Sequence, residues 1–262
     1  ATGRGTLNVA GGAEHGASSG GINAHPMDQF IVKPLFGDES LGLFTVTNQT
    51  LWLAVGVLFA FLLLALPTRN ATLVPGRMQS VAESLYMFVR KMVADILGEE
   101  GAKFFPYVFT VFMFILIANV TGLIPASFTP TAHIAVTGVL ALTVFVSVTV
   151  IGFMRHGLHF ISLFWVSSAP TVALRCVLFV IELISYFVRP LSHSVRLAGN
   201  MMAGHAVLKV FAAFVPALGL LGVVPIAAMT GIFALELLVA CVQAYIFTIL
   251  TCVYLKDALH LH

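Results

Sequence analysis

Long runs of apolar residues, separated by short polar segments, dominate the pattern of this chain. Three of these runs have about the length that an α-helix needs to cross a bilayer core of about 30 Å. They predict membrane-spanning helices over residues 49–66, 104–124 and 134–154. The first run is the shortest and stops at Pro67, a residue that disfavours continuation of a helix.

The segment 78–100 differs from the runs around it. Its apolar residues recur at spacings of three and four, and its charged residues fall on the other side of the predicted helix. The apolar positions are Val81, Leu85, Phe88, Val89, Met92 and Ile96. An amphipathic helix of this kind lies on the membrane surface or packs against a neighbour. We expect a surface helix here.

Two further apolar runs are too long for simple spans. Residues 171–214 contain no loop-like break, and at 1.5 Å per residue they would extend about 66 Å, twice the hydrocarbon thickness. Residues 226–255 follow a turn bounded by Pro216 and Pro225. The two runs predict strongly tilted helices that pack as a hairpin, a shape suited to curving around a cylindrical partner.

Composition fixes the class. Of the residues, 59% are hydrophobic and 9% charged, whereas a soluble domain has about 25% charged residues. The expected fold is an all-α polytopic membrane protein embedded in a lipid bilayer. Residues 1–48 form an N-terminal tail and interfacial segment, and residues 49–262 form the membrane domain. The net charge of +2 does not suggest nucleic acid as a partner.

Basic residues indicate an orientation. The loop between the spans 104–124 and 134–154 contains no Lys or Arg, whereas Arg90, Lys91, Lys103 and Arg155 lie at the opposite ends of these spans. By the positive-inside rule, the surface helix and Arg155 face the matrix or cytoplasm. The N-terminal tail then lies on the other side.

A polar stripe interrupts the first long run. At about 100° per residue, five side chains fall within roughly 60° of one another on the helix, namely Glu182, Arg189, His193, Arg196 and Asn200. His205 lies on the opposite face. An ionised group at the bilayer centre costs about 3 kcal/mol or more, so the stripe needs an explanation. One explanation is a structural ion pair between Glu182 and Arg189. The other is an ion or proton path through the membrane, and the length of the polar stripe favours this second explanation.

Three segments carry a resemblance to a known family. They read ANVTGLIPASFTPTAHI at 118–134, IELISYFVRPLSHSVRLAGNMMAGH at 181–205 and ELLVACVQAYIFTILTCVYLKDA at 236–258. Together they closely resemble subunit a of F-type ATP synthases, in order and over about residues 25–258. The resemblance implies a proton-conducting stator subunit beside a rotating ring of c subunits. Its other partners would be the peripheral stalk and further membrane subunits.

The resemblance also implies roles along the path of the protons. Arg196 matches the indispensable arginine, which keeps its charge, draws the ring carboxylate into its ionised state and separates two half-channels. Asn200 would orient Arg196 or water, or serve packing alone, and Gln243 would reach toward Arg196 across the hairpin. His205 and Glu236 would line the inlet half-channel, where imidazole exchanges protons near neutral pH.

The outlet half-channel would be lined by Glu182, Ser185, Tyr186 and His193. Many relatives have an apolar residue in place of His193, which therefore either tunes the outlet or only forms a hydrogen bond. Lys209 stands where some relatives have a second His, so a metal site is not expected. No cofactor is expected, and without a phosphate-binding glycine loop the isolated chain would catalyse nothing itself.

Two alternatives remain open at this point. The same polar stripe would suit a self-contained secondary transporter or channel, although the two halves show no inverted symmetry. As to location, the pairing of His205 with Glu236 and the absence of an initiator Met favour the mitochondrial inner membrane. The bacterial plasma membrane is the alternative.

Overall fold

The computed structural model describes residues 47–69, 75–124, 129–157, 159–160 and 171–259. The predicted tail and most of the interfacial segment lie outside these residues. The helices are α1 (Asn48–Arg69), α2 (Arg77–Leu97), η2 (Gly98–Lys103), α3 (Phe105–Gly122), η3 (Pro130–Ala132), α4 (Ile134–His156), α5 (Val172–Ala217), η5 (Gly219–Gly222) and α6 (Val223–Leu259). Helices α1, α3, α4 and α6 are long and apolar enough to cross a membrane. The prediction of an all-α polytopic membrane protein is confirmed.

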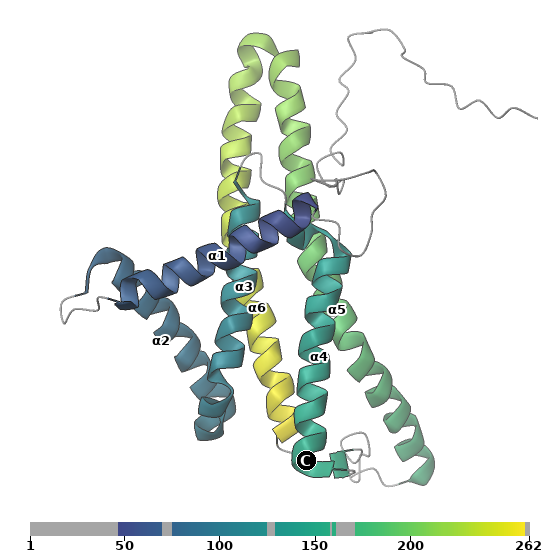
Figure 1. Ribbon diagram of the computed structural model, residues 1–262. Helices are drawn as coiled ribbons and strands as arrows, with labels where there is room; N and C mark the ends of the chain where they lie inside the picture. Colours follow the sequence, from purple (N-terminus) through teal and green to yellow (C-terminus); the bar gives the residue numbers. More distant parts are fainter. Residues whose placement is uncertain (1–46, 70–74, 125–128, 158, 161–170, 260–262) are drawn as a thin grey trace, which may run out of the picture.

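The long helices α5 and α6 form a hairpin. They contain 46 and 37 residues, and the turn between them includes Gly219 at φ 54, a conformation that glycine adopts without strain. Helix α5 continues through Pro190 and includes Pro216, so it ends slightly later than the pattern predicts. In Figure 1 the tip of this hairpin extends beyond the other helices, and the C-terminal end of α6 lies close to the end of α4.

The core lies where α3, α4 and the hairpin meet. Fully buried side chains there include Val108 and Ile115 on α3, Leu197 on α5, and Phe247 and Leu255 on α6. Burying such side chains fixes which faces of the two long helices turn inward, because each contributes one apolar stripe to the same cluster.

Two hydroxyl pairs join α4 to α5. Thr149 Oγ1 lies 2.6 Å from the Tyr186 hydroxyl, and Thr137 Oγ1 lies 3.2 Å from Ser194 Oγ. Both threonines also donate to backbone carbonyls of α4, so each pair is anchored to the helix. These bonds set the register between α4 and the polar part of α5.

Helix α2 packs against α3 and α6 through one face. Val89 is fully buried, and Phe88 lies 5.6 Å, centroid to centroid, from Tyr245 of α6. The helix ends at Leu97, earlier than residue 100, because Gly98 adopts φ 67 and a 3-10 turn follows. An amphipathic helix lies on the membrane surface or packs against a neighbour. The structure shows α2 packed against neighbouring helices.

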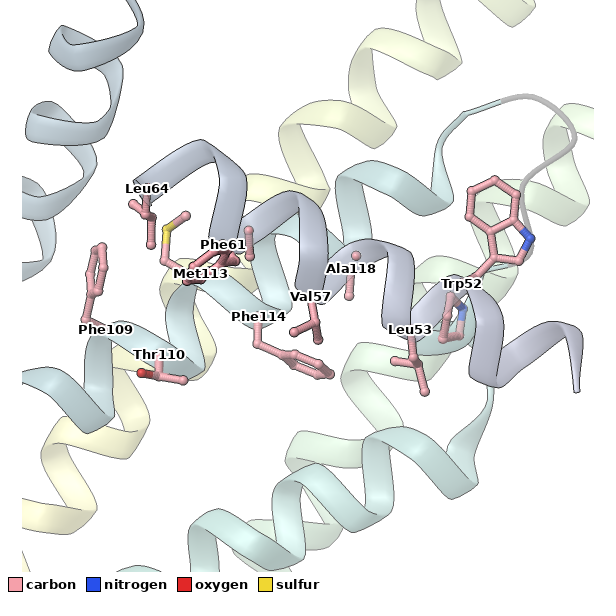
Figure 2. A pocket seen from close by; sticks show the side chains of 13 residues that line it. Trp52, Leu53, Val57, Phe61, Leu64, Phe109, Thr110, Met113, Phe114 and Ala118 are labelled. Atoms are coloured by element: carbon pink, nitrogen blue, oxygen red, sulfur yellow. The ribbon is translucent and has the colours of Figure 1, made fainter. Parts of the chain in front are cut away.

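Helix α1 crosses α3 and leaves an apolar pocket between them. The pocket has a volume of about 270 Å³, and its side chains include Val57 and Phe61 from α1 and Met113 and Phe114 from α3 (Figure 2). None of the predicted site residues lines it. The predicted site residues lie on α5 and α6 instead.

Candidate functional site

The structure gathers four of the predicted residues, His205, Glu236, Glu182 and Tyr186, in two clusters on the α5–α6 hairpin. The His205 cluster consists of His205, Glu236 and the groups that contact them. The Arg189 cluster consists of Arg189, Glu182, Asp257, Tyr186 and Tyr254. Along α5 the two clusters are about 24 Å apart, and Arg196 lies between them.

In the His205 cluster, three elements hold the imidazole. Its Nδ1 lies 2.9 Å from the Met201 carbonyl oxygen, one turn earlier on α5. Its Nε2 lies 3.0 Å from the Gly122 carbonyl oxygen at the end of α3 and 3.2 Å from Thr129 Oγ1, just before η3. The ring is therefore fixed between the hairpin and the end of α3.

Both ring nitrogens of His205 face carbonyl oxygens, which only accept hydrogen bonds. A neutral imidazole has one N–H group, whereas an imidazolium has two and can donate to both carbonyls. Glu236 Oε1 lies 3.9 Å from Nδ1 and supplies a counter-charge. The arrangement suits a group that takes up a proton and passes it on beside a carboxylate.

The Glu236 carboxylate is buried against Gly204. Its side chain is 10% exposed, and neither oxygen has a hydrogen-bond partner among the described residues. A Cβ added to Gly204 would overlap Glu236 Oε1. The glycine preceding His205 thus makes room for the carboxylate.

Arg196 has different surroundings from the other arginine of the polar stripe. It is exposed, and it makes no hydrogen bond or ion pair within the described part of the chain. One turn on, Asn200 Nδ2 donates to Gln243 Oε1 over 3.0 Å. The Gln243 side chain is buried, and its hydrogen bond to Asn200 lies one turn beyond Arg196 on α5.

The Arg189 cluster contains the ion pair that the sequence left as an alternative. Arg189 Nη2 lies 3.3 Å from Glu182 Oε1, and Nη1 lies 3.4 Å from Asp257 Oδ2 on α6. Tyr186 and Tyr254 flank the guanidinium at 5.7 and 4.9 Å from their ring centroids. The cluster joins both helices of the hairpin.

His193 and Ser185, also predicted for the outlet, differ from each other in burial and hydrogen bonding. His193 is buried, and its Nε2 is 3.2 Å from the Tyr254 hydroxyl, so it forms a hydrogen bond next to the Arg189 cluster. A cavity of about 20 Å³ borders both His193 and Arg189, with room for about one water molecule. Ser185 is exposed and makes no side-chain hydrogen bond among the residues described.

Sequence reasoning missed Asp257 and Tyr254. Asp257 is 14 residues after Gln243 and 21 after Glu236, and these separations place all three within about 60° on a helix. The same periodicity argument that was applied to α5 would therefore have found it. No comparable signal indicates Gly122 and Thr129, which act through a backbone carbonyl and a loop hydroxyl.

Comparisons with known proteins place the chain among a single group. A protein-family profile described as "ATP synthase A chain" matches residues 49–256. The chain is 62% identical to ATP synthase subunit a of Dinoroseobacter shibae and 61% identical to that of Paracoccus denitrificans, covering 92% of this chain and 97% of each relative. Identity to ATP synthase subunit a of Rhodospirillum rubrum is 48%, covering 90% of this chain and 99% of the relative.

Proposed function

The chain belongs to the ATP synthase A chain family, that is, to subunit a of the F-type ATP synthases, and from this premise we propose that it conducts protons as a stator beside the c-ring. Protons enter through one half-channel, neutralise a carboxylate of the ring, and leave through a second half-channel after the ring has turned. The c-ring, the peripheral stalk and other membrane subunits are the partners of the chain. Nucleotide chemistry belongs to other subunits.

The guanidinium of Arg196, which has no ion pair within the described residues, carries this proposal. A charge in the membrane that lacks a partner costs about 3 kcal/mol or more, so an arginine that is exposed on an apolar hairpin calls for an anion from outside the chain. A carboxylate of the ring provides that anion. Because a guanidinium is not deprotonated in proteins, Arg196 favours the ionised ring carboxylate and cannot itself relay a proton.

The two clusters on either side of Arg196 fit two half-channels. The His205 cluster combines an imidazole and a buried carboxylate, which exchange protons at the inlet. The Arg189 cluster, with Glu182, Tyr186 and His193 in or beside it, forms the outlet. Asn200 and Gln243 bond to each other next to Arg196 and hold the hairpin at this point.

The orientation of the chain in the membrane agrees with an outlet at the end of the bundle that carries the basic residues. Tyr186 bonds to Thr149 of α4, and His156 Nε2 lies 3.1 Å from the Leu259 carbonyl oxygen of α6. The Arg189 cluster is therefore at the same end of the bundle as Arg155, which forms an ion pair with Glu100 of η2 at 2.7 Å. This end faces the cytoplasm by the positive-inside rule.

We place the chain in a bacterial plasma membrane. Its relatives named above are bacterial, and they are similar over nearly the whole chain. The expectation of a mitochondrial inner membrane gains no support from them. The pairing of His205 with Glu236, on which that expectation relied, is equally compatible with an alphaproteobacterial protein.

The variant Arg196→Gln tests the proposal. We expect ATP-driven acidification of vesicles that contain the whole complex to fall to the level of vesicles without complex, because the ring carboxylate loses its counter-charge. Passive proton leak should rise, since the barrier between the half-channels is lost. Assembly is checked by the amount of subunit in the purified complex.

Arg69→Gln serves as the control, because Arg69 is an exposed arginine at the end of α1, away from the hairpin. It should pump like the unmodified complex. Undiminished pumping by Arg196→Gln in an assembled complex would overturn the proposal and favour a self-contained transporter.

A further inference from the structure

Three neighbouring pockets follow one another on the side of the molecule formed by α1, α2 and α3. The first is the apolar pocket of about 270 Å³ between α1 and α3, in which Leu64 and Phe109 lie at one end and Trp52 lies at the other (Figure 2). Leu64 and Phe109, together with Phe61, also line a second pocket of about 520 Å³, which α2 completes. We call this second one the middle pocket.

A third pocket adjoins the middle pocket through Tyr86. It has a volume of about 440 Å³, is formed by α2, η2 and the start of α3, and is called the α2 pocket below. Tyr86 lines both pockets, and its ring lies 4.8 Å from that of Phe105 and 5.8 Å from that of Phe109, centroid to centroid. The three pockets therefore form one row that is joined by shared side chains.

The two ends of this row differ in polarity. Arg90 and Glu99 line the α2 pocket, and both are exposed. Neither forms an ion pair with the other or with any other residue that the structure describes. At the opposite end, the pocket between α1 and α3 is lined by apolar and aromatic side chains apart from Thr110. A molecule that fits the whole row is charged at one end and apolar at the other.

The polar groups of the middle pocket differ from Arg90 and Glu99, because they have partners within the chain. Gln79 Nε2 donates to Glu83 Oε1 over 2.7 Å, and Thr68 Oγ1 donates to the Leu64 carbonyl oxygen over 2.8 Å. The α2 pocket is thus the part of the row that offers a cation and an anion to a ligand.

We propose that the row binds one phospholipid whose headgroup carries a phosphate and a primary ammonium group, as in phosphatidylethanolamine. The phosphate binds Arg90, the ammonium group binds Glu99, and an acyl chain lies along the middle pocket and the pocket between α1 and α3. A guanidinium forms charge-assisted hydrogen bonds with phosphate, and a carboxylate accepts them from an ammonium group. Each charge of the headgroup meets its opposite.

The position of the row in the membrane fits this ligand. An amphipathic helix such as α2 lies at the level of the lipid headgroups, with its apolar face toward the acyl chains. In the orientation proposed above, α2 lies on the cytoplasmic side, so the lipid belongs to the cytoplasmic leaflet. From there its acyl chain follows α1, which is long and apolar enough to span the membrane.

A transmembrane helix of another subunit is the other possible occupant, and the row suits it less well. A helix with its side chains is about 10–12 Å across, whereas each pocket has the volume of a small-molecule site. An apolar helix would also leave Arg90 and Glu99 without counter-charges. A lipid fills the apolar pockets and pairs both charges.

Photolabelling of the whole complex tests the proposal. The complex is placed in phosphatidylglycerol vesicles that contain a trace of a lipid with a photoreactive diazirine in its acyl chain. The headgroup of this probe is either ethanolamine or glycerol. We expect the ethanolamine probe to label the α3 peptide that contains Phe109 and Met113 several-fold more than the glycerol probe, because only ethanolamine supplies a cation for Glu99.

Three variants separate the parts of the site. Glu99→Gln should lower labelling by the ethanolamine probe to the level of the glycerol probe, since it removes the partner of the ammonium group. Arg90→Gln should lower labelling by both probes, because both contain the phosphate. Ala65→Phe should also lower both, since the larger side chain occupies the middle pocket.

Each variant has a matched control on the same helix. Asp95→Asn and Lys91→Gln change exposed charges of α2 that do not line the pockets, and Leu66→Phe enlarges an exposed side chain of α1 outside them. All three should be labelled like the unmodified complex.

Equal labelling of the unmodified complex by the two probes would overturn the proposal, and this comparison needs no variant to assemble. Labelling that persists in Glu99→Gln and Arg90→Gln would overturn it as well. An unlabelled α3 peptide would mean that another subunit covers the row, which also contradicts it. The measurement reads lipid contact and not proton pumping, so its outcome is independent of the test with Arg196→Gln.

Discussion

Two arginines seven residues apart on α5 have opposite surroundings. Arg189 is ion-paired to Glu182 and Asp257, and Arg196 is exposed with no ion pair among the residues described. A guanidinium that is already paired within the chain costs less to keep in a membrane than one that is not. The difference separates an arginine that joins two helices of the chain from one that is exposed on the hairpin.

At the same scale, replacing Gly204 by alanine is a small change for which we expect a large effect. In Gly204→Ala the new methyl group overlaps Glu236 Oε1, so the carboxylate must move away from His205. Overpacking of this kind costs about 1–3 kcal/mol. We expect less assembled complex and a proton-pumping rate per complex that is clearly reduced, measured by vesicle acidification.

Gly138→Ala is the matched control, because a Cβ there meets Ser194 Oγ at 3.5 Å, an ordinary contact. The double variant Gly204→Ala with Glu236→Ala should recover assembly but not pumping, since the overlapping carboxylate is gone. If Gly204→Ala behaved like Gly138→Ala, the close approach of Glu236 to α5 would be incorrect.

At the scale of elements, α2 shows what a helical pattern does and does not specify. Its apolar arc is broader than the face it buries, so part of the arc, including Val81 and Phe88, stays exposed. The buried part faces α3 and α6, and Val89 is at its centre. The helix is therefore held by tertiary packing, and its exposed apolar strip is available to lipid or to another subunit.

The variant Val89→Asp should detach α2 from the bundle, because a carboxylate would be placed at a fully buried position of the apolar core. We expect the amount of chain in the purified complex to fall several-fold. Ser84→Asp, on the exposed polar face of the same helix, should leave it unchanged. Equal amounts of the two variants would show that α2 does not dock through this face.

At the scale of the whole molecule, the hairpin presents a large apolar surface around Arg196. Val188, Leu191 and Val195 are all about half exposed, whereas Leu197 is fully buried. An apolar surface of this size on a membrane helix faces lipid or a partner. The exposed arginine in its midst favours the partner, which in the proposed function is the c-ring.

Cross-linking can test which face meets the ring. In a variant that lacks Cys176, Cys241 and Cys252, the substitution Val195→Cys should allow disulfides to form with cysteines placed on the outer helix of the ring. A cysteine at Leu197→Cys should not, because that position is inside the bundle. Equal cross-linking at both positions would contradict the packing of α5 against its neighbours.

Much of the fold could be predicted from the sequence, because apolar length and period depend only on local order along the chain. These features determined the all-α polytopic class, the two overlong helices and the amphipathic α2. Helix ends differed by a few residues: α1 continues through Pro67 to Arg69, and α2 ends at Leu97, before Gly98. The polar stripe on α5 was likewise evident from the spacing of its residues.

Tertiary structure alone decided which polar groups meet. Asp257 is 68 residues from Arg189, and Gly122 is 83 residues from His205, so no local pattern joins them. Their contacts depend on how α3 and α6 pack against α5, and packing is set by many small contacts distributed over the bundle. For this reason the sequence determined that charges lie in the membrane, whereas only the packed helices decided that Arg189 is ion-paired and that Arg196 has no ion pair within the described residues.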